Sequence, residues 1–162
     1  MGDALPQEQL GGFLAKYTPE IAAQAVEALE RLRAHVPGAV EMVYDNYNAL
    51  VIGFGATEKV SEAVLSIAVM PRWVDLCFLT GAKLPDPAGL LKGSGAVARH
   101  VVLGGPADID TPAVRALIAH AVEASVQPFE TTGPGRMVIK SISAKQRPRR
   151  PAEKEPARKP RK

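Results

Sequence analysis

The sequence predicts an α+β fold, in which a mostly antiparallel β-sheet packs against helices, followed by a disordered basic C-terminal tail. Apolar residues recur at helical spacing near the N-terminus and again in the last third of the chain, whereas between these segments they alternate with a period of two. This order is not the regular strand–helix alternation of a doubly wound sheet. With 162 residues, 46% of them hydrophobic, the chain is long enough for one domain with a substantial core.

Capping residues and apolar positions on one face predict helices over residues 7–16, 19–35 and 112–125. The first helix is weakened by Gly11 and Gly12, because glycine costs about 1 kcal/mol relative to alanine inside a helix. The second begins with the N-cap residue Thr18 and with Pro19, whose fixed φ suits the first helical position. The apolar face of this helix comprises Ile21, Ala25, Leu29, Leu32 and Val36. The third helix starts in the same way, with Pro112 at its first position.

Alternating apolar residues predict strands over residues 40–48, 49–55, 62–70, 73–79, 97–103 and 136–143. The first two are short and are joined by a bend around Asn48. Only Pro71 and Arg72 separate the third strand from the fourth, and this length is typical of an antiparallel hairpin. The consecutive strands therefore favour an antiparallel sheet with the helices on one face.

The net charge of +3 is unevenly distributed along the chain. Residues 145–162 hold nine Lys/Arg and two acidic residues, a net charge of +7, with four prolines and no large apolar residue. Such a segment buries too little apolar surface to fold, so we expect a disordered tail. Residues 1–144 hold eleven Lys/Arg and fifteen Asp/Glu, a net charge of −4, and are expected to form the single domain.

The sequence also lacks the signals of several protein classes. No apolar run approaches the roughly 20 residues that span a bilayer. The start "MGDALPQEQL" has neither the basic nor the apolar region of a secretory signal. Cys77 is the only cysteine, so no intrachain disulfide can form. We therefore expect a cytoplasmic protein that does not bind membranes.

The stretch "LLKGSGAVARHVVL" contains Gly93-x-Gly95-x-x-Ala98, the spacing of a dinucleotide-binding loop. That motif needs a strand before it and a helix N-terminus after it, whereas here a β-like segment follows. Ser94 does not form a nucleophile elbow either, because Lys92 stands where the first glycine is required. The stretch is better interpreted as a turn, one that could line a groove.

The histidines and the cysteine carry no recognisable catalytic or metal motif. His35, His100 and His120 lack the spacing of metal-ligand pairs. Cys77 alternates with apolar residues and is interpreted as a small buried side chain. A pair of Cys77 with His100 on neighbouring strands is compatible with the predicted sheet, but no other residue supports its use in catalysis. The question of enzymatic activity stays open, and its absence is the favoured interpretation.

Aromatic, amide and basic side chains gather in two stretches, "YDNYN" and "PRWV". Aromatic faces with amides and a guanidinium are typical of a small-molecule groove, although turn-forming Asn explains part of the pattern. Lys92 and Arg99 would hold an anionic group of the ligand, and we predict that Tyr44, Trp73 and Arg99 approach one shared cavity. The candidate ligand-binding residues are Tyr44, Asn46, Tyr47, Arg72, Trp73, Lys92, Gly93, Ser94, Gly95 and Arg99.

Carboxylates also gather on the second predicted helix and the first predicted strand. Carboxylates clustered on an exposed edge bind hard cations weakly. Arg31 and Arg33 interleave with them, so a salt-paired, solvated face is the alternative interpretation. The candidate metal ligands are Glu27, Glu30, Glu41 and Asp45.

Three longer segments carry a family resemblance: "YDNYNALVIGFG", "SIAVMPRWVDLCFLTGAKLPDPAGLLKGSGAVARHVVL" and "DTPAVRALIAHAVEAS". Over about residues 10–126 the sequence resembles the YdhG-like domain, a widespread bacterial family mostly without assigned function. The resemblance implies a compact α+β fold with an antiparallel sheet packed against helices. Some members of the family are regarded as frataxin-like iron chaperones, which implies an iron-binding role for the acidic edge.

Three functions are therefore expected as alternatives. The first is a non-enzymatic small-ligand-binding module of the YdhG-like type. The second is an iron-binding or iron-chaperone protein that uses the four carboxylates. The third is weak, non-specific nucleic-acid association through residues 145–162, whose basic side chains lie among prolines without aromatics to stack on bases. The sequence leaves open the identity of any ligand and the oligomeric state.

Overall fold

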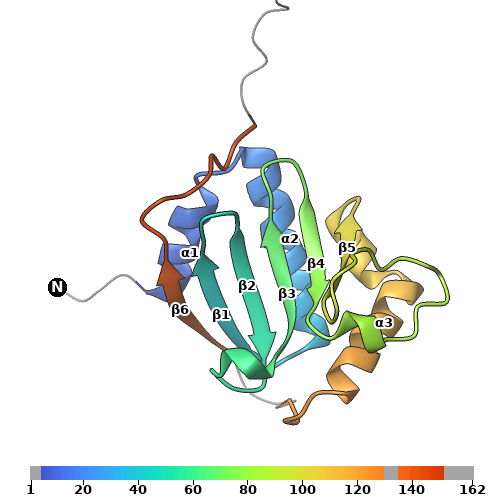
Figure 1. The fold of residues 1–162 in the computed structure, drawn as a ribbon. Helices are drawn as coiled ribbons and strands as arrows, with labels where there is room; N and C mark the ends of the chain where they lie inside the picture. The colour runs from blue at the N-terminus through green and yellow to red at the C-terminus, as the bar shows by residue number, and fades with distance from the viewer. Residues whose placement is uncertain (1–4, 130–134, 152–162) are drawn as a thin grey trace, which may run out of the picture.

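The computed structural model describes residues 5–129 and 135–151 (Figure 1). Within these ranges the chain forms three α-helices, three short 3₁₀ helices and one six-stranded sheet. The elements in chain order are α1 (Pro6–Leu14), α2 (Pro19–His35), β1 (Val40–Asp45), β2 (Leu50–Gly55), η1 (Val60–Glu62), β3 (Ala63–Val69), β4 (Val74–Phe78), η2 (Gly81–Lys83), β5 (Arg99–Leu103), η3 (Pro106–Asp110), α3 (Pro112–Glu123) and β6 (Arg136–Ile142).

The sheet has the strand order β5-β4-β3-β2-β1-β6. All neighbouring strands are antiparallel except β1 and β6, which are parallel. The predicted α+β fold with a mostly antiparallel sheet is therefore confirmed, and so is the hairpin of β3 and β4. The second predicted helix has the predicted bounds, whereas α3 ends at Glu123 instead of residue 125.

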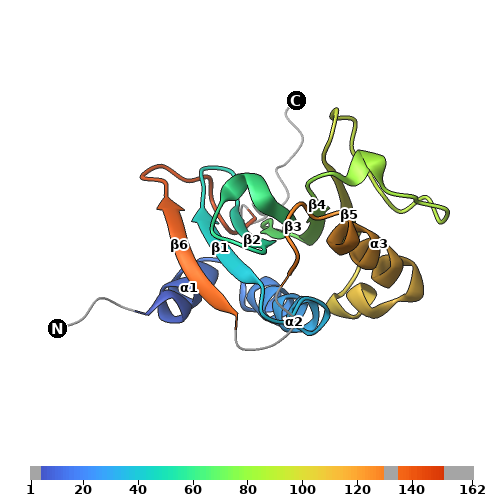
Figure 2. The same ribbon diagram turned by 90° about the horizontal axis from the view of Figure 1, so that it is seen from below.

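The three helices lie on one face of the sheet, as the two views show together (Figures 1 and 2). Strand alternation sends every second side chain to that face. The inward row at the centre of the sheet runs across five strands and is entirely apolar: Val43, Ile52, Ile67, Leu76 and Val101. These side chains form one core with the buried faces of the helices. The other face of the sheet, called the open face below, is not covered by an α-helix of the described chain (Figure 2).

The N-terminus of α2 forms as its sequence predicts. The hydroxyl oxygen of Thr18 accepts a hydrogen bond from the backbone N–H of Ile21 at 3.3 Å, and Pro19 occupies the first helical position. This capping satisfies one of the amides that a helix leaves unpaired at its start. It fixes the start of α2 directly after Tyr17, a residue of the buried polar cluster described below.

β6 brings the C-terminal segment back to the first strand. After β6, residues 143–151, called the strap below, cross the end of the sheet where β1 turns into β2 (Figure 1). The strap has no regular secondary structure, but Arg149 is only 5% exposed. Residues 145–151, which the sequence predicts to be part of the tail, thus pack on the domain through Arg149. The rest of the predicted tail lies outside the described residues.

Among the described residues no helix is both long enough and apolar enough to cross a membrane.

Candidate functional site

The structure places the predicted ligand-binding residues at two opposite ends of the sheet. Tyr44, Asn46 and Tyr47 lie at the end of β1 and in the turn that follows. Arg72 and Trp73 lie in the β3–β4 turn at the same end, because β2 begins where β3 ends. Of these side chains, Tyr44 and Asn46 have hydrogen-bond partners within the fold, and Arg72 lies away from the other four. Tyr44 donates to the sulfur of Met42, Asn46 accepts from Ser141, and Arg72 is exposed beside the start of α2.

Arg99 lies at the far end of the sheet, opposite Phe78, and on the helix-facing side. Tyr44 and Trp73 belong to the open face instead, since side chains alternate along each strand. The guanidinium of Arg99 donates to carbonyl oxygens of its own loop, at 2.5 and 2.7 Å. The prediction that Tyr44, Trp73 and Arg99 approach one cavity is therefore wrong.

The glycine-rich stretch forms an exposed loop. Gly93 has a φ of 121°, a conformation that L side chains rarely adopt, and β5 follows the loop instead of a helix. Gly93, Ser94 and Gly95 therefore have no helix N-terminus with which to hold a phosphate. The interpretation of this stretch as a turn is confirmed.

One polar row on the open face was not predicted as a site. Ser66, Cys77 and His100 lie directly opposite one another on β3, β4 and β5. The backbone N–H and C=O of His100 both bond to Lys92, on the side away from β4. Cys77 and His100 therefore form a non-hydrogen-bonded pair, the kind in which opposite side chains come closest. Lys92 extends the row on the same face, because it lies opposite His100 in an isolated bridge.

A second line of side chains on the open face runs along β4, beginning with the residue before the strand. Trp73, Asp75 and Cys77 alternate with buried apolar residues, so they project to the open face about 6.6–6.8 Å apart. The indole of Trp73 is 39% exposed and lies close enough to the Asp75 carboxylate to lower its pKa. We call the five residues Ser66, Trp73, Asp75, Cys77 and His100 the β4 site.

Asp75 is the residue of the β4 site with a buried polar atom that lacks a hydrogen-bond partner. Its Oδ1 atom is inaccessible to solvent and has no hydrogen-bond partner among the described residues. Burial raises the pKa of this carboxyl, while the Trp73 indole and the nearby His100 lower it by less. A buried acceptor without a donor costs about 1–3 kcal/mol. A ligand that brings a donor to this carboxylate, with a small shift of the side chain, would recover part of that cost.

Cys77 has the environment of a protonated thiol. Burial raises its pKa, a hydrogen bond with Ser66 lowers it by less, and the charge of Asp75 raises it further. The nucleophile in cysteine chemistry is the thiolate. The site therefore places a thiol beside an imidazole without the electropositive surroundings that activate cysteines.

The predicted acidic edge is largely ion-paired. Glu27 contacts Arg31 at 3.3 Å, and Glu41 accepts two hydrogen bonds from Arg33, at 2.7 and 2.8 Å. Asp45 faces the helices and is paired as described below. Within residues 5–129 and 135–151, no group of three or more His, Cys, Asp or Glu side chains is placed to hold a metal ion. The iron interpretation, which also includes Glu30, stays a prediction.

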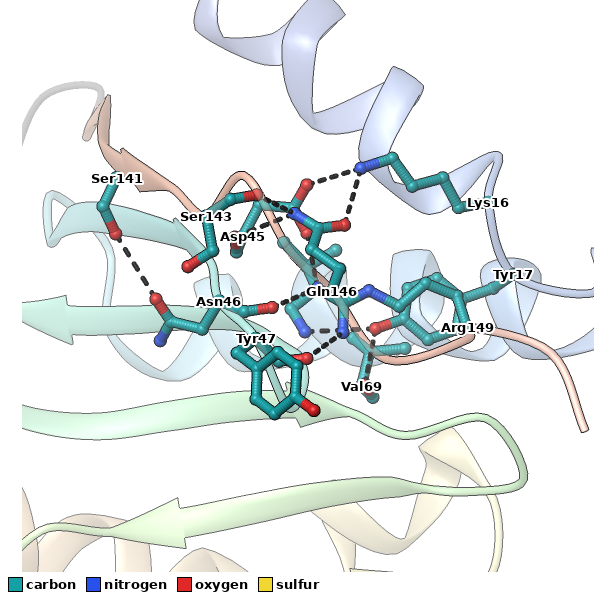
Figure 3. A network of polar contacts seen from close by, with 11 residues as sticks. Lys16, Tyr17, Asp45, Asn46, Tyr47, Val69, Ser141, Ser143, Gln146 and Arg149 are labelled. Carbon is teal, nitrogen blue, oxygen red and sulfur yellow. Dashed lines mark hydrogen bonds and ion pairs between the residues drawn. The ribbon is translucent and has the colours of Figure 1, made fainter.

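Asp45 is the centre of a buried polar cluster that Figure 3 shows in detail. Its carboxylate is fully buried and accepts from Lys16 at 2.7 Å and from Arg149 of the strap at 2.9 Å. The amide of Gln146 links the two sides, since it accepts from Lys16 and donates to the backbone oxygen of Asp45. Burial raises the pKa of Asp45, but the hydrogen bonds from Lys16, Gln146 and Arg149 outweigh it and hold the pKa below its ordinary value.

Tyr17 connects the cluster to β2 and β3 and contacts Arg149. Its hydroxyl donates to the carbonyl oxygen of Val69 at 2.7 Å and accepts from the backbone N–H of Leu50 at 3.1 Å. Its ring lies under the Arg149 guanidinium, 5.9 Å from the ring centroid. Burial raises the pKa of the Tyr17 hydroxyl, so it stays protonated and able to donate at neutral pH.

Comparisons of the chain with protein-family models, with curated proteins and with solved structures find no match. Function is therefore inferred from the geometry of the two clusters. Sequence reasoning missed the β4 site as a unit, although Trp73 was among the predicted residues and a Cys77–His100 pair was compatible with the predicted sheet. The available signal was the alternation of polar residues with buried ones along β4.

Proposed function

We propose that the protein binds a small ligand on the open face of its sheet, at the β4 site. The observation that carries the proposal is the Asp75 carboxylate, one oxygen of which is buried without a donor among the described residues. Native structures pair the great majority of such groups, so an exception beside an exposed tryptophan marks a place for a ligand.

The surroundings of Asp75 favour a ligand with an ammonium group or another N–H donor. A carboxylate accepts from such a donor, and the face of the Trp73 indole attracts a cation within about 6 Å of the ring centroid. Val102, which lies opposite Asp75 on β5 and is 42% exposed, offers an apolar contact for the rest of the molecule. Binding without catalysis is favoured because the neighbouring Cys77 thiol is held in its protonated form.

Trp73 is the only tryptophan of the chain, so its fluorescence reports on the β4 site alone. The test is a titration of the full chain with small amines, amino acids and polyamines, monitored by Trp73 emission. We expect one class of amine to shift the emission, and Asp75→Asn to weaken this binding by about tenfold or more, a loss of 1.4 kcal/mol or more.

Glu123→Gln is the matched control, because it removes an exposed carboxylate of α3. It should leave the titration unchanged. Equal responses of the wild type and Asp75→Asn, or no response to any amine, would remove the β4 site from consideration.

A further inference from the structure

The Arg149 side chain occupies a pocket built like a receptor for a guanidinium group. Its NH2 nitrogen donates to the Asp45 carboxylate at 2.9 Å and to the carbonyl oxygen of Asn46 at 2.5 Å, and its NH1 nitrogen lies 3.4 Å from the carbonyl oxygen of Tyr47 (Figure 3). The Tyr17 ring closes one side. A carboxylate, carbonyl oxygens and an aromatic face are the groups that recognise arginine.

The walls of this pocket come from residues 17–47 and have supports of their own. The Tyr17 hydroxyl is held by β2 and β3 through Leu50 and Val69, and Lys16 holds the second oxygen of Asp45. Of these supports only Lys16 also contacts the strap, through the side chain of Gln146. The pocket is thus organised independently of the side chain that fills it.

Arg149 is the buried anchor of the strap. Arg149 is the only residue of the strap that is buried, while Lys145, Arg147 and Arg150 are exposed. The strap buries no large apolar residue and forms no strand. Its other hydrogen bonds are those of side chains and amides near the surface, from Ser143, Gln146, Arg147 and Arg150, so the strap can open without exposing the core. The fit is also incomplete, since the Nε of Arg149 is buried without a partner among the described residues.

We propose that the pocket of Tyr17, Asp45, Asn46 and Tyr47 is an arginine-recognition site, which Arg149 fills in cis and which accepts a guanidinium group from another molecule when the strap opens. The guanidinium is that of a peptide arginine or of a free small molecule. Because a tethered side chain competes at an effective concentration in the millimolar range, an outside ligand binds weakly until the strap is displaced. This site lies on the helix-facing side of the sheet end and is separate from the β4 site.

The test is chemical rescue in the full chain. Arg149→Ala empties the pocket, and ethylguanidinium at low millimolar concentration should then raise the unfolding midpoint, by about 3–6 °C at ten times its Kd. Ethylammonium, which carries the same charge without the planar fork, is the matched ligand control. A peptide of residues 143–151 is a second ligand, and a stronger rescue by this peptide than by ethylguanidinium identifies a peptide arginine as the ligand.

The wild type should gain much less from ethylguanidinium, and Asp45→Asn/Arg149→Ala should gain nothing. The proposal is overturned if folded Arg149→Ala shows no rise, or if ethylammonium raises the midpoint equally.

Hydrogen exchange in the wild type tests the proposal even if Arg149→Ala does not fold. The backbone N–H of Arg147 bonds to Tyr47 in the closed strap, at 2.8 Å. We expect it to exchange at least tenfold faster than the amides of β2 and β3, because the strap opens without the sheet. Exchange of Arg147 only at the rate of global unfolding would mean that the strap does not open, and would sink the proposal.

Discussion

Replacing Arg149 with alanine tests how much the strap contributes to the fold. The side chain is 4% exposed and pairs with Asp45, which is fully buried. Removing one partner of a buried ion pair costs about 3–5 kcal/mol, because the other charge stays buried and loses its partner. Here Lys16 still holds the second oxygen of Asp45 at 2.7 Å, so we expect the lower end, about 3 kcal/mol.

The pH dependence follows from the lowered pKa of Asp45. A carboxyl whose pKa is lower in the folded state contributes stability above its ordinary pKa, about 3.9, and loses it as the pH falls. The cost of Arg149→Ala should therefore be complete at pH 7 and should shrink below about pH 4.

Urea unfolding of the wild type and of Arg149→Ala, at pH 7 and at lower pH, measures the stability lost in the variant and the change of this loss with pH. A loss of 3 kcal/mol corresponds to a fall of about 6–12 °C in the unfolding midpoint for a domain of this size. Arg150→Ala is the matched control, because this exposed side chain only donates to carbonyl oxygens at the end of α1, and it should cost about 1 kcal/mol or less. Equal costs for the two variants would refute the assignment of Arg149 as the anchor of the strap.

Three further predictions concern charge. Asp75→Asn should raise the stability at pH 7 by less than about 1 kcal/mol, since burial raises the pKa of Asp75 and so destabilises its charged form, while the side chain is only partly buried and thus partly screened. The gain should disappear as the pH falls below about 4. A constant difference in urea unfolding across this range would contradict the burial of the charge. Ferrous iron should bind weakly and equally to the wild type and to Glu27→Gln/Glu30→Gln, because the acidic edge is largely ion-paired. Titration of both proteins with ferrous iron measures this. Loss of binding in the variant would support the iron hypothesis. A chain that ends at Pro151 should lose the affinity of the full chain for random duplex DNA, because residues 152–162 hold five Lys/Arg. In the full chain these five charges would give a slope of about −4 to −5 in a plot of log K against log salt concentration. Binding that survives the truncation would place the contact in the folded domain.

Local sequence patterns predicted the elements of the fold well. Thr18 and Pro19 define the start of α2 through hydrogen bonding and a fixed φ, which depend only on neighbouring residues. The hairpin of β3 and β4 was also predictable from neighbouring residues. Apolar residues alternate along both strands, and only Pro71 and Arg72 separate the two predicted strands. The position of β6 was not predictable in this way, because its parallel pairing with β1 joins strands far apart in the chain.

The candidate sites depended on contacts between distant segments. Composition correctly describes residues 145–151 as basic and poor in apolar residues, but it assigned them to a disordered tail. It could not reveal that Arg149 reaches Asp45, 104 residues earlier. Only the parallel pairing of β6 with β1 delivers the strap to that carboxylate.

The sequence by itself determined the α+β class, the approximate positions of the helices and the alternation of side chains along each strand, because these follow from interactions within a few residues. The tertiary structure alone decided which alternating positions meet. Register placed Cys77 opposite His100 and sent Arg99 to the helix-facing side, away from Tyr44. The physical reason is that a shift of one residue in strand pairing moves every side chain to the other face, and the pairing is chosen by burial of the whole core.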